Sequence, residues 1–321
     1  MNWPDDFIDQ IICSNNLDIL KTLPNESINC CITSPPYWAL RDYGVDGQLG
    51  LEPTFQEYLD KLIAIFDEVK RVLRKDGTCW VVLGDTYSGS GCGTNDYRTE
   101  KSKSIQGKGK NRNLYKTGGI AQKITNVVQA KSLLQIPSRF AIMMTDHGWI
   151  LRNEIIWYKP NCMPSSVKDR FTVDFEKIYF FTKNQKYYFE QQLEPYESKE
   201  NHNPRNKNAE KYNGTNLFSE GGRDYYSQGG RNKRCVWSIN TKPFKEAHFA
   251  VFPPTLVVPM IKAGCPENGI VLDPFIGSGT VAEVALKLNR HFIGIELSPE
   301  YCEIAKKRIK EIQPQLVFGN C

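Results

Sequence analysis

The sequence Ser34-Pro35-Pro36-Tyr37 combines hydrogen-bond acceptors with an aromatic ring where the chain must turn. It follows the apolar run 28–33, which is typical of a buried strand. Two consecutive prolines cannot continue a strand ladder because neither carries an N–H group. The chain therefore leaves the sheet in a stiff turn with free carbonyl groups. Rigid acceptors beside a stacking ring suit a flat base bearing an amino group, so we expect chemistry on an exocyclic amine of a nucleobase.

A second motif, Asp-Pro-Phe-Ile-Gly-Ser-Gly-Thr at residues 273–280, follows the apolar run 270–272 and opens a predicted helix. Ligands of parallel α/β sheets bind beyond the carboxyl ends of the strands, where such turns lie. Gly277 and Gly279 allow the backbone to approach a ligand closely. The next predicted strand ends at Glu296, whose carboxylate can accept both hydroxyl groups of a ribose. A nucleoside-bearing cofactor is therefore expected.

The second motif lacks the features that bind a chain of phosphates. The third glycine of a dinucleotide fingerprint is missing, and Thr280 and Val281 stand where a phosphate-binding loop has Lys and Ser or Thr. Asp273 would repel a pyrophosphate but could attract the ammonium group of an amino acid. These features fit S-adenosyl-L-methionine better than NAD or ATP.

Together the two motifs resemble those of the beta-class, circularly permuted, amino-methylating DNA methyltransferases. That family carries Ser-Pro-Pro-Tyr or Asp-Pro-Pro-Tyr for catalysis, followed by Asp-Pro-Phe-x-Gly-Ser-Gly-Thr for the cofactor. Both motifs stand intact here, and the resemblance covers nearly the whole chain except two polar segments. It implies site-specific methylation of double-stranded DNA, in a restriction–modification system or as an orphan or phage enzyme. Family resemblance alone suggests a homodimer, and it is left open whether a cognate restriction endonuclease accompanies the enzyme.

The resemblance also implies roles for individual residues. The catalytic residues are Ser34, Pro35, Pro36 and Tyr37. The cofactor-binding residues are Asp18, Phe252, Asp273, Pro274, Phe275, Gly277, Ser278, Gly279, Thr280 and Glu296. Asp18 would contact the cofactor adenine and Phe275 would pack against the cofactor. Phe252 belongs to a His-x-Ala-x-Phe-Pro segment that borders the methionine end. A helix cap or a solvated turn residue for Asp18, and a core position for Phe252, remain the alternatives.

The acceptors of the first motif suggest a mechanism. An exocyclic amino nitrogen is a poor nucleophile because its lone pair is delocalised into the ring. Hydrogen bonds accepted by the Ser34 side chain and the Pro35 carbonyl would favour a pyramidal nitrogen that attacks the sulfonium methyl group in line. Tyr37 would stack on the base after it has been flipped out of the duplex. Methylation of cytosine C5 is excluded because it needs a Pro-Cys turn, and none of the 18 prolines precedes a cysteine.

The identity of Ser34 bears on the choice of base. Family members with Ser at this position usually act on cytosine N4, and those with Asp usually act on adenine N6. We therefore expect cytosine N4, with adenine N6 as the alternative because either side chain can accept from an amino group. A third hypothesis is a nucleic-acid-binding protein that has lost catalysis, but the intact Ser34, Tyr37, Asp273 and Glu296 count against it.

Strand and helix patterns alternate along most of the chain, which indicates a parallel sheet covered on both faces. With the family resemblance, this predicts a Rossmann-like α/β methyltransferase fold with a mostly parallel seven-stranded sheet and polar insertions for DNA recognition. Strands are expected over 11–13, 28–33, 78–83, 150–158, 177–182, 270–272 and 292–295, with an antiparallel extension at 187–189. Helices are expected over 17–23, 54–73, 138–146, 254–263, 280–288 and 299–312, the second ending at a glycine stop, Gly77.

Basic residues gather in two polar segments, 86–126 and 199–245, each with six more basic than acidic residues. Such segments suit contact with a polyanion, with solvated loops as the alternative. The expected domains are a catalytic part (1–193, with the basic insertion 86–126), a target-recognition region (194–235) and the cofactor-binding part of the same catalytic domain (236–321). The DNA-binding candidates are Lys168, Arg170, Arg205, Lys207, Arg223, Arg231, Lys233 and Arg234. For Lys168 and Arg170, which flank Asp169, an exposed ion pair is the alternative.

Composition excludes several other classes of protein. A hydrophobic content of 40% and a charged content of 24% are ordinary for a soluble globular protein. No apolar stretch reaches the length of a membrane span and the N-terminus lacks signal-peptide features, so a cytoplasmic protein without a membrane partner is expected. The ten cysteines include no Cys-x-x-Cys pair, which favours small buried thiols, including Cys13, over disulfides or a metal site.

Overall fold

The computed structural model describes residues 2–40, 42–88, 128–195, 230–241 and 252–318. Contacts divide the chain into two units, one formed by residues 1–189 and 235–321 and the other by residues 190–234. The first unit contains the α/β sheet. In its described residues, the second contains the hairpin of β6 (Leu193–Glu194) and β7 (Arg231–Asn232).

Within the described residues, the sheet of the first unit has eight strands in the order β1-β10-β9-β2-β3-β5-β4-β8. Among these strands only β5 runs antiparallel to its neighbours. The predicted mostly parallel α/β fold is confirmed, with eight strands instead of seven because β8 pairs with β4. The strands are β1 (Gln10–Cys13), β2 (Ile28–Thr33), β3 (Leu73–Leu83), β4 (Ile150–Tyr158), β5 (Phe175–Thr182), β8 (Val236–Ser238), β9 (Ile270–Asp273) and β10 (His291–Glu296).

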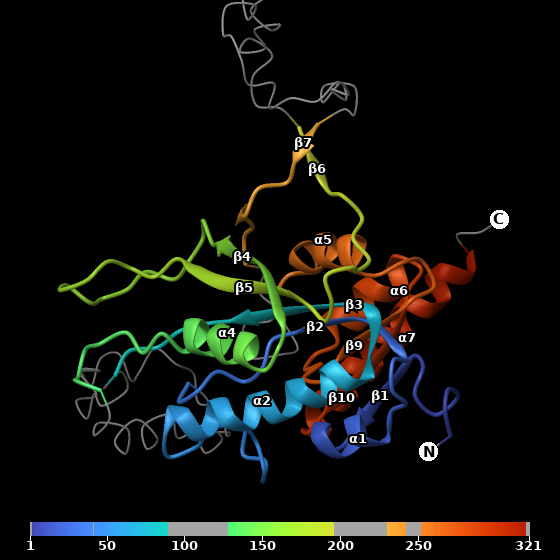
Figure 1. Cartoon of the computed structure of the whole chain (residues 1–321), viewed down its shortest axis with the longest axis horizontal. Helices are drawn as coiled ribbons and strands as arrows, with labels where there is room; N and C mark the ends of the chain where they lie inside the picture. The colour runs from blue at the N-terminus through green and yellow to red at the C-terminus, as the bar shows by residue number, and fades with distance from the viewer. Residues whose placement is uncertain (1, 41, 89–127, 196–229, 242–251, 319–321) are drawn as a thin grey trace, which may run out of the picture. The chain divides into compact units, whose positions relative to one another are not determined.

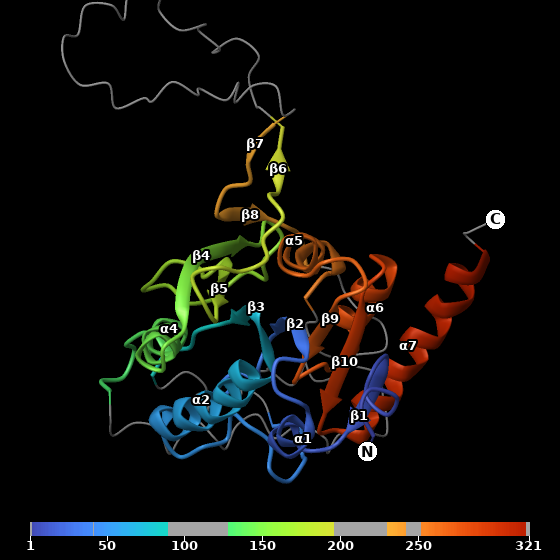
Figure 2. The same cartoon turned by 45° about the vertical axis from the view of Figure 1, so that its right-hand side comes forward.

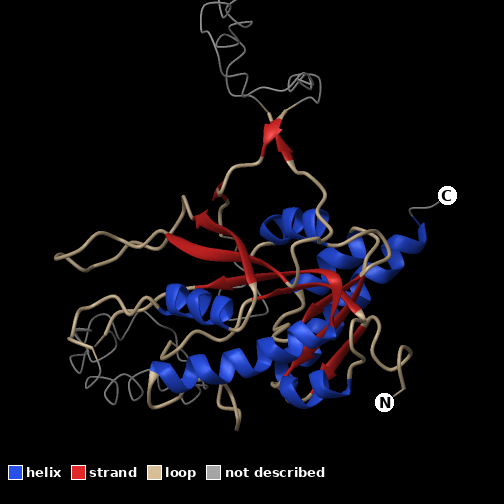
Figure 3. Cartoon of the chain, viewed as in Figure 1, coloured by secondary structure: helices blue, strands red, loops and turns tan. Residues whose placement is uncertain are grey.

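In the same part of the chain, three helices cover each face of the sheet (Figures 2 and 3). One face packs against α1 (Asn16–Thr22), α2 (Phe55–Val72) and α4 (Ile136–Asp146), and the other against α5 (Pro254–Gly264), α6 (Thr280–Lys287) and α7 (Pro299–Phe318). Successive residues of a strand point to opposite faces. Accordingly, Cys31 lies in the first apolar core, while Cys30 and Ile32 lie in the second.

Three local predictions were wrong. The helix α2 ends at Val72, because Leu73 is already extended and β3 starts there, so Gly77 is not a helix stop. A Cβ at Gly77 would lie 3.2 Å from the Asn29 carbonyl oxygen of β2, so strand packing requires a small residue. Residues 187–189 form no strand, and the rings of Tyr187 and Phe189 pack on Phe180 instead. Cys13 is exposed, because it ends the edge strand β1.

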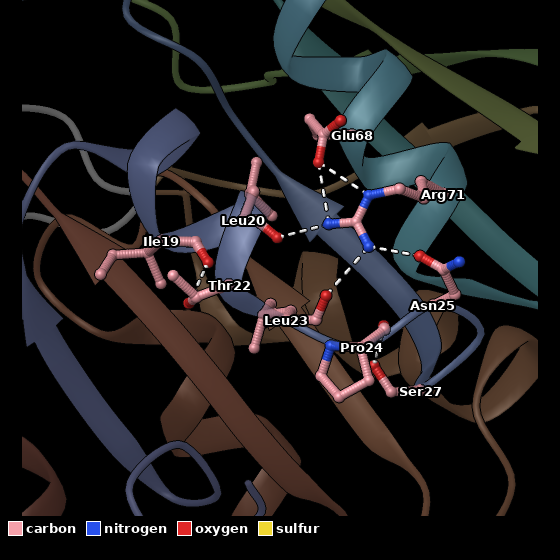
Figure 4. Close-up of polar contacts among 9 residues, drawn as sticks. All are labelled: Ile19, Leu20, Thr22, Leu23, Pro24, Asn25, Ser27, Glu68 and Arg71. Atoms are coloured by element: carbon pink, nitrogen blue, oxygen red, sulfur yellow. Dashed lines mark hydrogen bonds and ion pairs between the residues drawn. The ribbon is translucent and has the colours of Figure 1, made fainter. Parts of the chain in front are cut away.

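Arg71 near the end of α2 fixes the chain where it enters β2 (Figure 4). Its guanidinium donates to the carbonyl oxygens of Leu20 (2.7 Å) and Leu23 (2.9 Å), at the end of α1. It also donates to the side chains of Asn25 and Glu68. One guanidinium thus binds two of the carbonyl groups at the C-terminal end of the helix. This holds the start of the strand that delivers the Ser34 turn.

None of the described helices has both the length and the apolar character that are needed to span a lipid bilayer.

Candidate active site

The two sequence motifs follow neighbouring strands of the sheet. β2 and β9 are parallel and pair Cys31 with Leu272, so the turns that begin at Ser34 and Pro274 leave the same edge side by side. This is the edge at which open α/β sheets bind ligands. The last residues of the two strands are joined directly, because the Thr33 hydroxyl donates to Asp273 Oδ1 at 2.6 Å. Tertiary structure therefore brings together two segments that lie 240 residues apart in the sequence.

One cavity of about 540 Å³ lies against both turns. The predicted catalytic residues Ser34, Pro35, Pro36 and Tyr37 all line it, and so do the predicted cofactor-binding residues Phe252, Pro274, Phe275, Gly277, Ser278, Thr280 and Glu296. The remaining cofactor-binding candidates, Asp18, Asp273 and Gly279, are not among the lining residues. Residues 248–251 of the His-x-Ala-x-Phe-Pro segment lie outside the described part of the chain.

Glu296 is held rigidly at the cavity by two backbone groups. The N–H of Gly277 donates to Oε2 and the N–H of Ser298 donates to Oε1, both at 2.9 Å. Burial raises the pKa of this carboxyl group above its ordinary value. Each carboxylate oxygen keeps a second lone pair, so hydroxyl groups in the cavity can still donate to it. The arrangement fits the predicted role of binding ribose.

The two glycines of the cofactor motif, Gly277 and Gly279, are needed for different structural reasons. Both have positive φ values, +52° at Gly277 and +84° at Gly279, where a side chain is strained. Gly277 lines the cavity, and a Cβ there would meet only its own loop, at 4.0 Å. A Cβ at Gly279 would lie 3.1 Å from Cβ of Ala305 in α7. Gly279 is therefore required for the close packing of α6 and α7.

Asp18 lies in the first turn of α1 with an exposed side chain. The helix cap is Asn15, whose Oδ1 accepts from the backbone N–H groups of Leu17 and Asp18, so the alternative of a cap at Asp18 is wrong. Asn15, Asn16 and Leu17 line the cavity, and Asn16 Nδ2 donates to the Pro274 carbonyl at 3.3 Å. The start of α1 thus adjoins the cofactor motif, while contact between Asp18 and an adenine stays a prediction.

Asp273 is buried beneath the two turns. Its Oδ1 accepts from the Thr33 hydroxyl and, at 3.0 Å, from the backbone N–H of Phe275. Burial raises the pKa of the Asp273 carboxyl group to about 7, because these hydrogen bonds only partly offset the loss of water. In this position Asp273 ties β2, β9 and the cofactor turn together. Its predicted contact with an ammonium group stays a prediction.

The burial of Asp273 predicts a pH-dependent stability in the absence of ligand. Because its pKa is raised from 3.8 to about 7, the native state binds this proton more tightly than the unfolded chain does. The stability that this group contributes is complete below about pH 4 and declines as the pH rises toward 7. Asp273→Asn has no such proton, so we expect it to remove roughly 1–3 kcal/mol of the decline between about pH 5 and pH 8. Urea unfolding of both proteins across this range measures the effect, and parallel pH profiles would contradict it.

Tyr37 is fixed by a polar network that the sequence did not suggest. Its hydroxyl donates to Glu176 Oε2 at 2.8 Å, and Glu176 is also paired with Lys159. The Lys159 ammonium lies 4.2 Å from the ring centroid of Trp157, and all four residues line the cavity. Burial and the Glu176 charge raise the pKa of the Tyr37 phenol, which keeps it protonated as the donor. No sequence motif marks Trp157, Lys159 and Glu176. They come together because β4 and β5 pair as a hairpin.

Contacts with Gly84 and Tyr58 also fix the predicted catalytic turn, residues 34–37. A Cβ at Gly84, directly after β3, would overlap the Tyr37 ring, so the ring packs on this backbone. The Tyr58 hydroxyl donates to the Pro36 carbonyl at 2.8 Å. Trp38, the next residue, is buried in the core and its indole N–H donates to the Glu52 carbonyl. Within the described residues we find no donor to the Pro35 carbonyl, the proposed acceptor.

The DNA-binding candidates fall in separate places. Lys168 and Arg170 lie between β4 and β5, with the Arg170 guanidinium 4.0 Å from the Tyr87 ring centroid. In the second unit, Arg231 and Arg234 both bind Glu194, at 2.9 and 2.8 Å, and Lys233 pairs through its backbone with Gln192. Outside the described residues lie Arg205, Lys207, Arg223 and nearly all of the basic insertion 86–126.

Comparison with known proteins assigns the family. The N6/N4 methyltransferase model, a family of DNA methylases, matches residues 28–307. The type II methyltransferase M.XycI of Xanthomonas campestris pv. cyanopsidis is 41% identical over 296 residues, covering 92% of this chain and 85% of the relative. M.SmaI of Serratia marcescens is 37% identical over 302 residues, covering 94% and 90%.

Two solved structures share the fold at about 20% sequence identity. The cytosine-N4-specific PvuII DNA methyltransferase superimposes with a TM-score of 0.60 over 98% of this chain and 96% of its own. TTHA0409 from Thermus thermophilus, solved in complex with S-adenosyl-L-methionine, has a TM-score of 0.55 over 95% and 96%. The chain belongs to the N6/N4 DNA methylase family and is a relative of the type II DNA methyltransferases.

Proposed function

We propose that this protein transfers a methyl group from S-adenosyl-L-methionine to the exocyclic N4 of cytosine at specific sites in double-stranded DNA. The observation that carries the proposal is the cavity shared by the Ser34 turn and the Glu296 side chain. A nucleoside-binding carboxylate and two amine acceptors in one enclosed space suit transfer between a nucleoside cofactor and an amino group. A volume of about 540 Å³ is of the size that holds small-molecule ligands.

The residues present fit S-adenosyl-L-methionine, which supplies an electrophilic methyl group when bound. Glu296 would accept from its ribose, because both carboxylate oxygens are already oriented by backbone donors. Phe275 and Phe252 give the cavity apolar surface on which adenine and methionine groups can pack. The backbone of Gly277 permits close approach. No phosphate loop is needed for such a cofactor.

On the acceptor side, the Ser34 side chain and the Pro35 carbonyl would accept the two hydrogen bonds of the target amino group. These bonds orient the nitrogen and make its lone pair available for in-line attack. Tyr37 would stack on the base, with its ring held by Gly84 and its hydroxyl held by Glu176. A base buried in a duplex cannot reach such a cavity, so the proposal includes base flipping.

The choice of cytosine N4 rests on Ser34. Similarity to type II methyltransferases supports a place in restriction–modification, with a cognate endonuclease as partner. The target-recognition region would be residues 194–235, and a homodimer remains part of the proposal. Adenine N6 methylation on the same fold is the second candidate, because Ser34 can accept from either amine.

Nucleoside analysis tests the proposed function. The protein is incubated with methyl-labelled S-adenosyl-L-methionine and unmethylated DNA, the DNA is digested to nucleosides, and the labelled product is separated. We expect N4-methylcytosine, and sequencing of the methylated DNA gives the target site. Labelled N6-methyladenine would overturn the choice of base. Cofactor binding without any labelled base would favour a protein that has lost catalysis.

A further inference from the structure

The connection between β4 and β5, residues 159–174, leaves the sheet as an extended arm (Figure 1). Its two ends lie at the cavity, because Lys159 at one end and Glu176 just beyond the other both line it. The ends are clamped by the Lys159–Glu176 ion pair and by a backbone hydrogen bond of 2.7 Å from Lys159 N to the Asp174 carbonyl. Phe171 lies three residues before Asp174, so at most about 11 Å of extended chain separates it from the clamped end beside the cavity.

The arm carries apolar side chains that the described residues of the protein leave exposed. Phe171 is 95% exposed and Met163 is 88% exposed. Val167, Val173 and Phe175, on the arm or next to it, are also exposed. Exposed apolar residues that gather on one segment forfeit the free energy of burial and mark an interaction site. The neighbours of Phe171 point to the chemistry of the partner, since Lys168 and Arg170 are basic and the adjacent acid, Asp169, is already paired with Lys131.

Two contacts orient the part of the arm that presents Phe171. Lys131 Nζ lies 2.6 Å from Asp169 Oδ2, and the Arg170 guanidinium lies over the Tyr87 ring. Each exposed contact is weak alone, but together they hold consecutive residues to two other segments of the chain. Phe171 follows directly, and its ring is exposed among the residues that the structure describes. A ring presented in this way can meet a partner without first being reorganised.

We propose that Phe171 inserts into the DNA duplex and fills the space that the target base leaves when it turns into the cavity. The inference rests on the proposed function, because it requires base flipping. Removal of a base breaks its stacking on both neighbours, and an inserted aromatic ring replaces part of that contact. Lys168 and Arg170 would bind the flanking phosphates, for which their charge is complementary. A second copy of this basic surface would be repelled.

The test compares two DNA duplexes that contain the target site mapped by nucleoside analysis. In one the target base is paired, and in the other an abasic position lies opposite it, so that flipping is already easy. We expect Phe171→Ala to lower kcat/KM on the paired duplex by about 10- to 100-fold and on the abasic duplex by less than about threefold. Phe171→Trp keeps an aromatic ring and should retain activity within about threefold on both.

Two matched variants control for loss of apolar surface elsewhere on the arm. Met163→Ala and Val173→Ala are expected to behave like the wild type, although both residues are exposed. Equal losses for Phe171→Ala on the two duplexes, or a loss with Met163→Ala instead, would overturn the inference. So would a change of association state for Phe171→Ala in sedimentation velocity, which would make the arm a contact between copies. If the wild type methylates no DNA, the proposed function itself fails, whereas an active wild type and an equally active Phe171→Ala overturn the inference alone.

Discussion

Replacement of Ser34 by Ala is expected to slow methyl transfer to DNA by roughly 100- to 1,000-fold, the scale observed when one positioned hydrogen bond is removed from a reacting centre. Ser34 follows β2 directly and lines the cavity between Pro35 and the cofactor turn. Alanine leaves the backbone and the Pro35 carbonyl in place and removes one of the two acceptors for the amino group. The affinity for S-adenosyl-L-methionine should stay within about twofold, because the proposed cofactor contacts lie on other elements.

The same element offers a matched control. Ser27 immediately precedes β2 as Ser34 immediately follows it, and its hydroxyl donates to the Pro24 carbonyl at 2.8 Å, away from the cavity (Figure 4). Ser27→Ala should therefore leave turnover unchanged. Single-turnover methylation of mapped target DNA measures the chemical step for both variants. A Ser34→Ala enzyme with more than about a tenth of the wild-type rate would remove this side chain from the proposed mechanism.

Glu296→Gln is expected to weaken binding of S-adenosyl-L-methionine by about 10- to 100-fold, since hydrogen bonds to a charged group are worth about 1.5–3 kcal/mol. The native carboxylate accepts from the N–H groups of both Gly277 and Ser298. A carboxamide has only one oxygen, so its NH2 group must face one of these donors. The substitution removes the charge, loosens the cofactor turn and leaves one fewer acceptor for ribose. Turnover at saturating cofactor should change far less than affinity.

Glu300→Gln provides the charge-matched control, because Glu300 is an exposed residue in the first turn of α7. It removes the same negative charge a few residues away without touching the backbone donors. Isothermal titration with S-adenosyl-L-methionine compares both variants with the wild type. If Glu296→Gln binds as tightly as Glu300→Gln does, the ribose role assigned to Glu296 is wrong.

Local patterns in the sequence predicted the strands and helices that carry the two motifs. Apolar runs that end in Pro-Pro or in a glycine-rich turn mark the ends of β2 and β9, and helical spacing of apolar residues marks α2. These signals are local, because hydrophobic periodicity and proline geometry act over a few residues. The end of α2 was misplaced because Gly77 resembles a helix stop, while its actual role is to let β3 approach β2.

The sequence by itself predicted the chemistry of the site: amine acceptors at Ser34 and Pro35, and a ribose-binding acid at Glu296. Only the tertiary structure decided how the turns combine and what supports them. Pairing of β2 with β9 joins Thr33 to Asp273, which made Asp273 a buried link between strands. The β4–β5 hairpin brings Glu176 to Tyr37 and carries the exposed ring of Phe171 on the connection between its two strands. Such contacts depend on which strands are neighbours, a property of the folded sheet that no spacing along the chain records.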